Sequence, residues 1–261
     1  MNLLKLPRPF TTPRNISLPA IDHSCFLHGE PYEPFLKARA SRLSTRTTAF
    51  GMKFRRRYEL LSMNELRILL SLCFNPYVID IREQYAIFND EDYWRAYAAG
   101  KRMLRTDVRT IDFYVTHLLP GSVQLHNHGI SIKEPSYVPN EKERRREEWE
   151  KQAMAEMNGT WELVRGDAVS SREFANNWAM YRTIREQNVR ALYDQALWFS
   201  KRLLSGSTRG TMDSVLARVS RALGIAEDDG HRLFAVGASF GFLTVDHEKE
   251  LLPSARLHLI R

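Results

Sequence analysis

Apolar residues recur at two different spacings in the stretch from residue 58 to residue 135. Around Glu65 they fall at i−4, i+3, i+4 and i+7, which predicts a helix with one packed face: Leu61, Ile68, Leu69 and Leu72. Residues 110–115 and 130–133 alternate between apolar and polar side chains instead, as half-buried strands do. This stretch therefore predicts one helix followed by two strands.

Three charged residues interrupt these patterns. Glu65 breaks the apolar stripe of the helix, and Asp112 lies in a strand whose Ile111, Phe113 and Val115 we expect together on the opposite face. Lys133 ends the second strand, on the same face as Ser131. The predicted elements would bring two carboxylates and one ammonium group to a common edge of the sheet.

Such a group of side chains has a chemical use. Two carboxylates can hold a hard divalent cation such as Mg²⁺, and a nearby lysine can orient a water molecule or offset charge on a phosphate. Each residue also has a structural explanation. Ser62 and Glu65 form the pattern of a helix capping box, Asp112 fits a solvated strand position, and Lys133 fits a surface lysine.

The order of these residues resembles that of the TnsA family, the endonuclease subunits of heteromeric cut-and-paste transposases. The resemblance rests on residues 60–66, 76–87, 110–113 and 130–133, and the run Asp-Ile-Arg-Glu-Gln at 80–84 is its most specific part. It implies a restriction-endonuclease-like domain and catalytic roles for Glu65, Asp112 and Lys133. Weaker similarity extends to residues 29–35 and 161–167.

The resemblance also implies a metal site. Glu65 and Asp112 would hold Mg²⁺, which Mn²⁺ could replace, with Ser131 in a supporting contact. Gln84, at the end of the strand predicted over 77–87, could also support the site or could equally be a surface residue at the edge of the sheet. Ser131 stands where the family usually has an acid or Gln, and serine is a weaker ligand. The sequence leaves open whether a second metal binds and whether the missing ligand comes from the carbonyl of Ile132 or from the following helix: Glu147, Glu148 or Glu150.

Charge is distributed unevenly along the 261 residues. The net charge is +7, and all of the excess lies in residues 1–60, which contain 11 Lys or Arg and 4 Asp or Glu. A basic segment ahead of a nuclease-like centre suits neutralisation of DNA phosphates, although it could also be a tail with no fixed partner. The candidate phosphate contacts are Lys37, Arg39, Arg42, Arg46, Lys53, Arg55, Arg56, Arg57, Lys101, Arg102 and Arg105.

The pattern outside the central stretch divides the chain into three regions. Residues 1–34 contain six prolines and form a basic arm that we expect to order only on a partner. Residues 35–168 form the α/β nuclease domain with a mixed sheet. They also predict a strand over 77–87, a short helix after Asn89, a charged helix over 140–157 and a strand from Thr160.

From residue 169 to residue 261 the pattern becomes mainly helical. A helix at 212–223, another near 227–236 and a strand-like segment at 241–247 suggest a winged-helix arrangement. Residues 169–261 contain 13 Lys or Arg and 10 Asp or Glu, a smaller basic excess than that of residues 1–60, and the resemblance implies that they bind an ATPase regulator of the TnsC kind. The two cysteines, Cys25 and Cys73, have no metal-site spacing.

The sequence thus favours a Mg²⁺-dependent DNA endonuclease. By resemblance it would act on double-stranded transposon ends with a TnsB-like transposase, in the cytoplasm and without a membrane. The alternative is a non-catalytic DNA-binding or assembly subunit with a decayed centre, which Ser131 favours. A stand-alone repair or restriction nuclease is a third possibility, and the C-terminal region argues against it.

Overall fold

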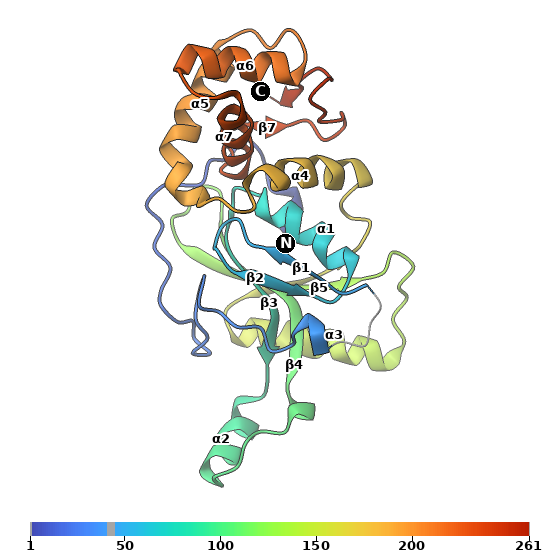
Figure 1. Cartoon of the computed structure of the whole chain (residues 1–261). Helices are drawn as coiled ribbons and strands as arrows, with labels where there is room; N and C mark the ends of the chain where they lie inside the picture. The colour runs from blue at the N-terminus through green and yellow to red at the C-terminus, as the bar shows by residue number, and fades with distance from the viewer. Residues whose placement is uncertain (1, 41–44, 261) are drawn as a thin grey trace.

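The computed structural model describes residues 2–40 and 45–260, and it is a mixed α/β protein (Figure 1). Its main sheet has the strand order β3-β4-β5-β6, with the first three strands antiparallel and β6 parallel to β5. The strand bounds are β3 Val78–Ile87, β4 Arg109–Leu118, β5 Leu125–Lys133 and β6 Thr160–Arg165. The mixed sheet predicted from the sequence is confirmed.

Two helices pack on this sheet. Helix α1 (Met63–Cys73) begins at Ser62, whose hydroxyl accepts a hydrogen bond from the Glu65 N–H, as the capping pattern predicts. Helix α3 (Glu141–Glu156) begins with a complete capping box between Asn140 and Glu143. The side chains of α1 join the larger hydrophobic core, whereas α3 contributes to a smaller second core.

The two cores show that β3 and β4 exchange faces part-way along their length. Phe113 and Val115 lie in the larger core with α1, but Ile111 lies in the second core with Met154 of α3. The prediction that Ile111 shares a face with Phe113 is therefore wrong. The physical reason is in the neighbouring strand, where Gln84 has a left-handed backbone (φ 47°) and breaks the alternation of side chains.

The hairpin of β3 and β4 extends beyond the sheet and carries α2 (Asp90–Ala98), which projects from the body of the molecule (Figure 1). Asn89 caps this helix through the Asp92 N–H, and Gly100 follows it with φ 66°, so the short helix predicted after Asn89 is confirmed. A 3-10 turn (Arg105–Asp107) leads from the helix back into β4.

The C-terminal region is helical and shares the larger core with the sheet domain. The Tyr181 hydroxyl of α4 accepts from the Phe50 N–H and donates to the Phe50 carbonyl, and Ser71 of α1 donates to Glu173 of α4 at 2.7 Å. The helices are α4 Ser171–Ile184, α5 Tyr193–Ser205, α6 Met212–Leu223 and α7 Glu227–Ser239, with a 3-10 turn at Val189–Leu192. The helices expected at 212–223 and near 227–236 are confirmed.

Among the described residues of this region, two short strands accompany the helices, β7 (Thr244–Val245) and β8 (Leu259–Ile260). The strand expected over 241–247 is therefore limited to two residues. Across the described residues, no helix has the length and apolar character needed to cross a membrane.

The N-terminal segment packs against the rest of the chain. Leu3, in a 3-10 turn (Leu3–Lys5), is buried in the larger core, and the Phe10 ring stacks on Tyr77 with centroids 3.8 Å apart. It is thus anchored within the chain itself, contrary to the prediction that only a partner orders it. The chain then forms a 3-10 turn and a two-stranded sheet: η2 Ala38–Ala40, β1 Thr47–Phe50 and β2 Arg57–Leu60.

Candidate active site

Glu65 lies in the first turn of α1, where its carboxylate is buried and bonded on several sides. One oxygen accepts from the Leu61 N–H at 2.9 Å and from the Gln84 side-chain amide at 3.3 Å, and the other accepts from the Ser62 hydroxyl at 3.2 Å. The capping role and the candidate site role therefore coincide in one residue.

Gln84 joins Glu65 to the central strands. Its side-chain oxygen lies 3.4 Å from the Thr110 hydroxyl, and its backbone carbonyl accepts from the Phe35 N–H instead of from β4. The β3–β4 pairing accordingly skips Gln84 and resumes at Tyr85. A buried non-glycine residue in the left-handed region costs on the order of 1–3 kcal/mol, and such residues cluster at functional sites.

Asp112 occupies the point where β4 and β5 separate. Their last backbone pair is Phe113 with Ile130, and beyond it the Asp112 carboxylate accepts from the Ile132 N–H at 2.6 Å. Because the N–H and C=O of one strand residue point to the same side of the strand, the Ile132 carbonyl also faces β4.

Glu150 of α3 is the carboxylate that approaches Ser131. It is 2% exposed, and it accepts from the Ser131 hydroxyl at 2.5 Å and from Arg146 at 2.8 Å. The other two candidates from this helix are placed differently, since Glu147 bonds to the Tyr137 hydroxyl and Glu148 lies at the surface beside Lys151. Among the three glutamates left open by the sequence, Glu150 is the one next to the site.

Lys133 ends β5 beside these groups. Its positive charge lowers the pKa of Asp112, which shows that the two side chains are electrostatic neighbours. Its ammonium also lies 5.4 Å from the centre of the Tyr137 ring, and its side chain is partly exposed. The ammonium is thus close to the carboxylates and accessible from solvent.

Electrostatics in the site oppose ionisation of its acids. Burial raises the pKa of Glu65, and the Asp112 carboxylate raises it further. Burial also raises the pKa of Asp112, an effect that Glu150 adds to and that the Ile132 N–H and Lys133 reduce. Two neighbouring carboxylates whose pKa values are both raised are typical of a site that protons or cations neutralise.

The side chains fit a hard cation in part. Glu65, Asp112 and the Ile132 carbonyl offer oxygen ligands, as Mg²⁺ requires. Glu150 is bonded to Ser131 and Arg146, and within the described part of the chain no group of three or more His, Cys, Asp or Glu residues is arranged to hold a metal ion. The predicted metal ligands Glu65, Asp112, Ile132 and Glu150 therefore stay a prediction.

Comparisons with known proteins were made for the whole chain. No family model and no curated protein matches it. The geometry of the site and the resemblance in motif order are therefore the grounds on which a function is proposed.

The predicted phosphate contacts divide into two groups. The exposed ones are Arg39, Arg46, Arg55, Arg57, Lys101, Arg102 and Arg105. Of these, Arg57 is paired with Glu59, and Arg105 lies over the Phe35 ring. Lys37 is partly exposed and paired with Glu33. Arg42 lies outside the described residues. Lys53 and Arg56 are buried, and for these two the prediction is wrong.

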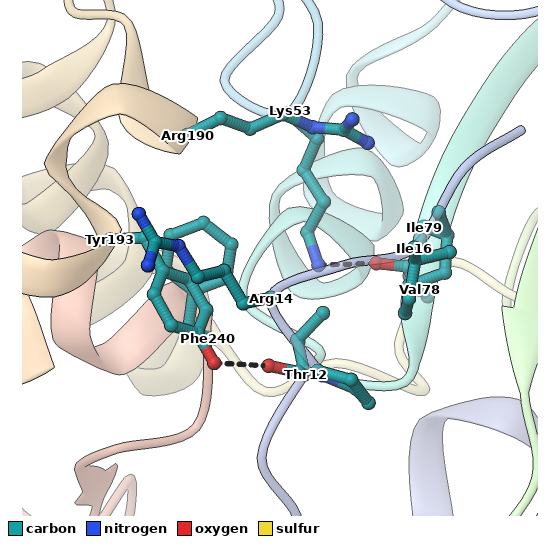
Figure 2. Close-up of a pocket in the computed structure, with 10 residues that line it drawn as sticks. Thr12, Arg14, Ile16, Lys53, Val78, Ile79, Arg190, Tyr193 and Phe240 are labelled. Atoms are coloured by element: carbon teal, nitrogen blue, oxygen red, sulfur yellow. Dashed lines mark hydrogen bonds between the residues drawn. The ribbon is translucent and has the colours of Figure 1, made fainter. Parts of the chain in front are cut away.

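Lys53 and Arg56 instead form hydrogen bonds and an ion pair inside the protein. Lys53 donates to the carbonyls of Asn75 and Val78 at 2.9 and 2.5 Å, beside a cavity of about 70 Å³ between the N-terminal segment and the helical region (Figure 2). Burial lowers the pKa of Lys53 to about 7. Arg56 forms two hydrogen bonds with the Glu83 carboxylate.

Two residues of the site were not among the sequence-based candidates. Arg146 bonds to Glu150 and helps to lower the pKa of Asp112, and the Trp161 indole donates to Ser131 at 3.1 Å. The spacing of Arg146 and Glu150, four residues apart on a helix, is a signal that could have found the first. The contact of Trp161 depends on the β5–β6 pairing and has no local signal.

Proposed function

We propose that this chain is a metal-dependent DNA endonuclease of the TnsA type. It would hydrolyse phosphodiester bonds at the 5′ ends of a mobile element while a TnsB-like transposase cuts the 3′ ends. The proposal is carried by the electrostatic proximity of the three groups, since the Asp112 charge raises the pKa of Glu65 and the Lys133 charge lowers that of Asp112, and by their order, which the family resemblance implies.

Each residue has a distinct task in this proposal. Glu65 and Asp112 would hold Mg²⁺ together with the Ile132 carbonyl, and the bound ion would polarise the scissile phosphate and lower the pKa of its water. Lys133 would orient the attacking water and offset charge on the phosphate. The hydrogen bond from Ile132 N–H fixes the Asp112 carboxylate, and Gln84 fixes that of Glu65.

Substitution of Asp112 tests the proposal. Asp112→Asn keeps an oxygen for the Ile132 N–H but removes the negative charge. We therefore expect the rate of metal-dependent cutting to fall by about 10³-fold or more, which is typical of the loss of a catalytic group in a hydrolase. The measurement is nicking of plasmid DNA in Mg²⁺ or Mn²⁺, with the partner transposase supplied. Asp167→Asn, in the exposed turn after β6, is the matched control. Unchanged cutting by Asp112→Asn would refute the assignment.

A non-catalytic assembly subunit is the second candidate function. Two features favour it: Ser131 stands where the family usually has an acid or Gln, and the Glu150 carboxylate is already bonded to Ser131 and Arg146. Isothermal titration with Mn²⁺ separates the two: binding heat that disappears in Asp112→Asn supports the endonuclease, whereas no heat from either protein supports the assembly subunit. An integrase-like gene and an ATPase gene beside the coding sequence would support a transposition role for both, with the C-terminal region as the proposed docking site of the ATPase.

A further inference from the structure

The projection at the end of β3 and β4 has no role in the hydrophobic core. We call residues 89–109 the finger; it contains α2, none of whose residues is buried, and the basic segment that returns to β4. Figure 1 shows it standing clear of the sheet and of every other helix. Its two supporting strands are the ones that carry Gln84 and Asp112.

Three aromatic side chains gather on α2. Tyr93, Trp94 and Tyr97 contact one another, with ring centroids 5.2 Å apart for Tyr93 and Trp94 and 5.8 Å for Trp94 and Tyr97. Trp94 is 60% exposed and Tyr97 67% exposed. Large aromatic rings that are exposed together on a projecting helix, with no core to support, are a binding surface.

Positive charge lies beside these rings and extends toward the active site. Residues 101–109 carry Lys101, Arg102, Arg105 and Arg109 against the one acid Asp107. Within the described residues, no carboxylate lies within ion-pair distance of Lys101 or Arg102. Arg109 lies over the ring of Trp149, the residue that precedes Glu150. The basic limb therefore leads from the aromatic rings to the edge of the site.

We propose that the finger grips the DNA beside the scissile phosphate, with Lys101 and Arg102 on the phosphate backbone and Trp94 and Tyr97 against unstacked bases. This inference rests on the proposed endonuclease function. Arg102 lies ten positions before Asp112, so their Cα atoms are at most about 36 Å apart. That reach corresponds to about ten base pairs at 3.4 Å per pair.

Charge favours DNA over a protein partner for this surface. Apart from Asp107, the acids of the finger lie in the first turn of α2, at Asp90, Glu91 and Asp92, where they suit the helix dipole, and Asp92 is paired with Arg95. The unpaired cations lie at the other end, next to Tyr97. Aromatic rings beside a basic track are the combination by which proteins hold unstacked nucleic acid.

The test measures DNA binding by the full chain, independently of cutting. Fluorescence polarisation with a 30-base-pair duplex and with the same duplex carrying a single-stranded flap should show about fivefold or greater weakening for Trp94→Ala on the flapped DNA. The matched control is Trp198→Ala in α5, which removes an equally exposed tryptophan (69%) outside the finger. The double change Lys101→Ala with Arg102→Ala should reduce the slope of log affinity against log salt by about 2.

The second measurement is the position at which the finger contacts the DNA. A photo-crosslinking amino acid at Tyr97, fifteen positions before Asp112, should attach to DNA within about 15 base pairs of the cut. If wild-type protein binds DNA and Trp94→Ala binds it equally well, or if the crosslink goes to a transposase subunit or a second copy of the chain, the finger proposal is overturned and the endonuclease proposal stands. If wild-type protein binds neither DNA at low salt, both proposals fail.

Discussion

Two clusters of buried charge lie on the same sheet and have opposite electrostatics. In the first, Arg56 pairs with Glu83, and Arg82 pairs with Asp22, all with side chains that are almost wholly buried. Hydrogen bonds and the guanidinium of Arg82 hold the pKa of Asp22 below its ordinary value despite burial. In the second, the Asp112 charge adds to the effect of burial on Glu65, and the pKa of each acid is raised.

The first cluster contains charges that stabilise the fold, and the second contains charges that a bound ligand would neutralise. Each acid of the first cluster has a cation of the same chain against it, and removing either partner would leave an unpaired buried charge. Lys133 only partly offsets the like charges of the second cluster. A protein keeps such an unfavourable pair where function requires it, because its removal would otherwise increase stability.

The largest effect should come from breaking the first cluster. Glu83→Gln leaves Arg56 buried without its counter-ion and weakens the bond to the Glu59 N–H, so we expect the free energy of unfolding to fall by about 3–5 kcal/mol. Urea denaturation measures it. Glu148→Gln, at an exposed position of α3, should change the free energy of unfolding by less than about 0.5 kcal/mol. An equal effect of both substitutions would mean that the buried pair of Arg56 and Glu83 stabilises the fold no more than an exposed pair does.

A divalent cation should act on the second cluster alone. Mg²⁺ at one hundred times its dissociation constant should add about 2.7 kcal/mol to the free energy of unfolding. Because the pKa values of Glu65 and Asp112 are raised, protons compete with the ion, and the thermal shift should be larger at pH 8.5 than at pH 6. A shift of the same size in Asp112→Asn would show that the ion binds elsewhere.

Without metal, Asp112→Asn should make the protein more stable. An acid with a raised folded-state pKa costs stability above that pKa and costs nothing once both states are protonated. The gain should therefore be about 1 kcal/mol at pH 8.5, seen as roughly 2–4 °C in melting temperature, and should disappear toward pH 4. A loss of stability at pH 8.5 would mean that the Asp112 charge serves the fold.

Local patterns predicted the elements of the site, and long-range contacts determined the rest. The helix that carries Glu65 and the strands that carry Asp112 and Lys133 follow from periodicity, since each buries an apolar face. The pattern also predicted the strand over 77–87 but not its burial along the whole length, because residues far away cover its polar side chains: Asp22 bonds to Arg82, and His28 lies 3.1 Å from Asp80. Those partners are 52 or more residues distant, beyond any local pattern.

The same limit explains the misassigned basic residues and the change of face at Ile111. Nothing within a few residues of Lys53 or Arg56 distinguishes them from exposed Arg55, and their burial depends on carbonyls and on Glu83 in a different strand. The face change depends on one backbone angle at Gln84, a residue type that ordinarily continues a strand.

The packing of the N-terminal segment has a consequence for synthesis. Thr12 donates its N–H to the carbonyl of Phe240 and accepts from the Tyr193 hydroxyl, so its binding place is built from residues translated more than 180 positions later. At about 5–20 residues per second, a ribosome needs on the order of ten seconds or more to produce them. The contacts of Thr12 with the helical region can form only after that interval, although the Thr12 hydroxyl also donates to the carbonyl of Pro76, which is translated much earlier.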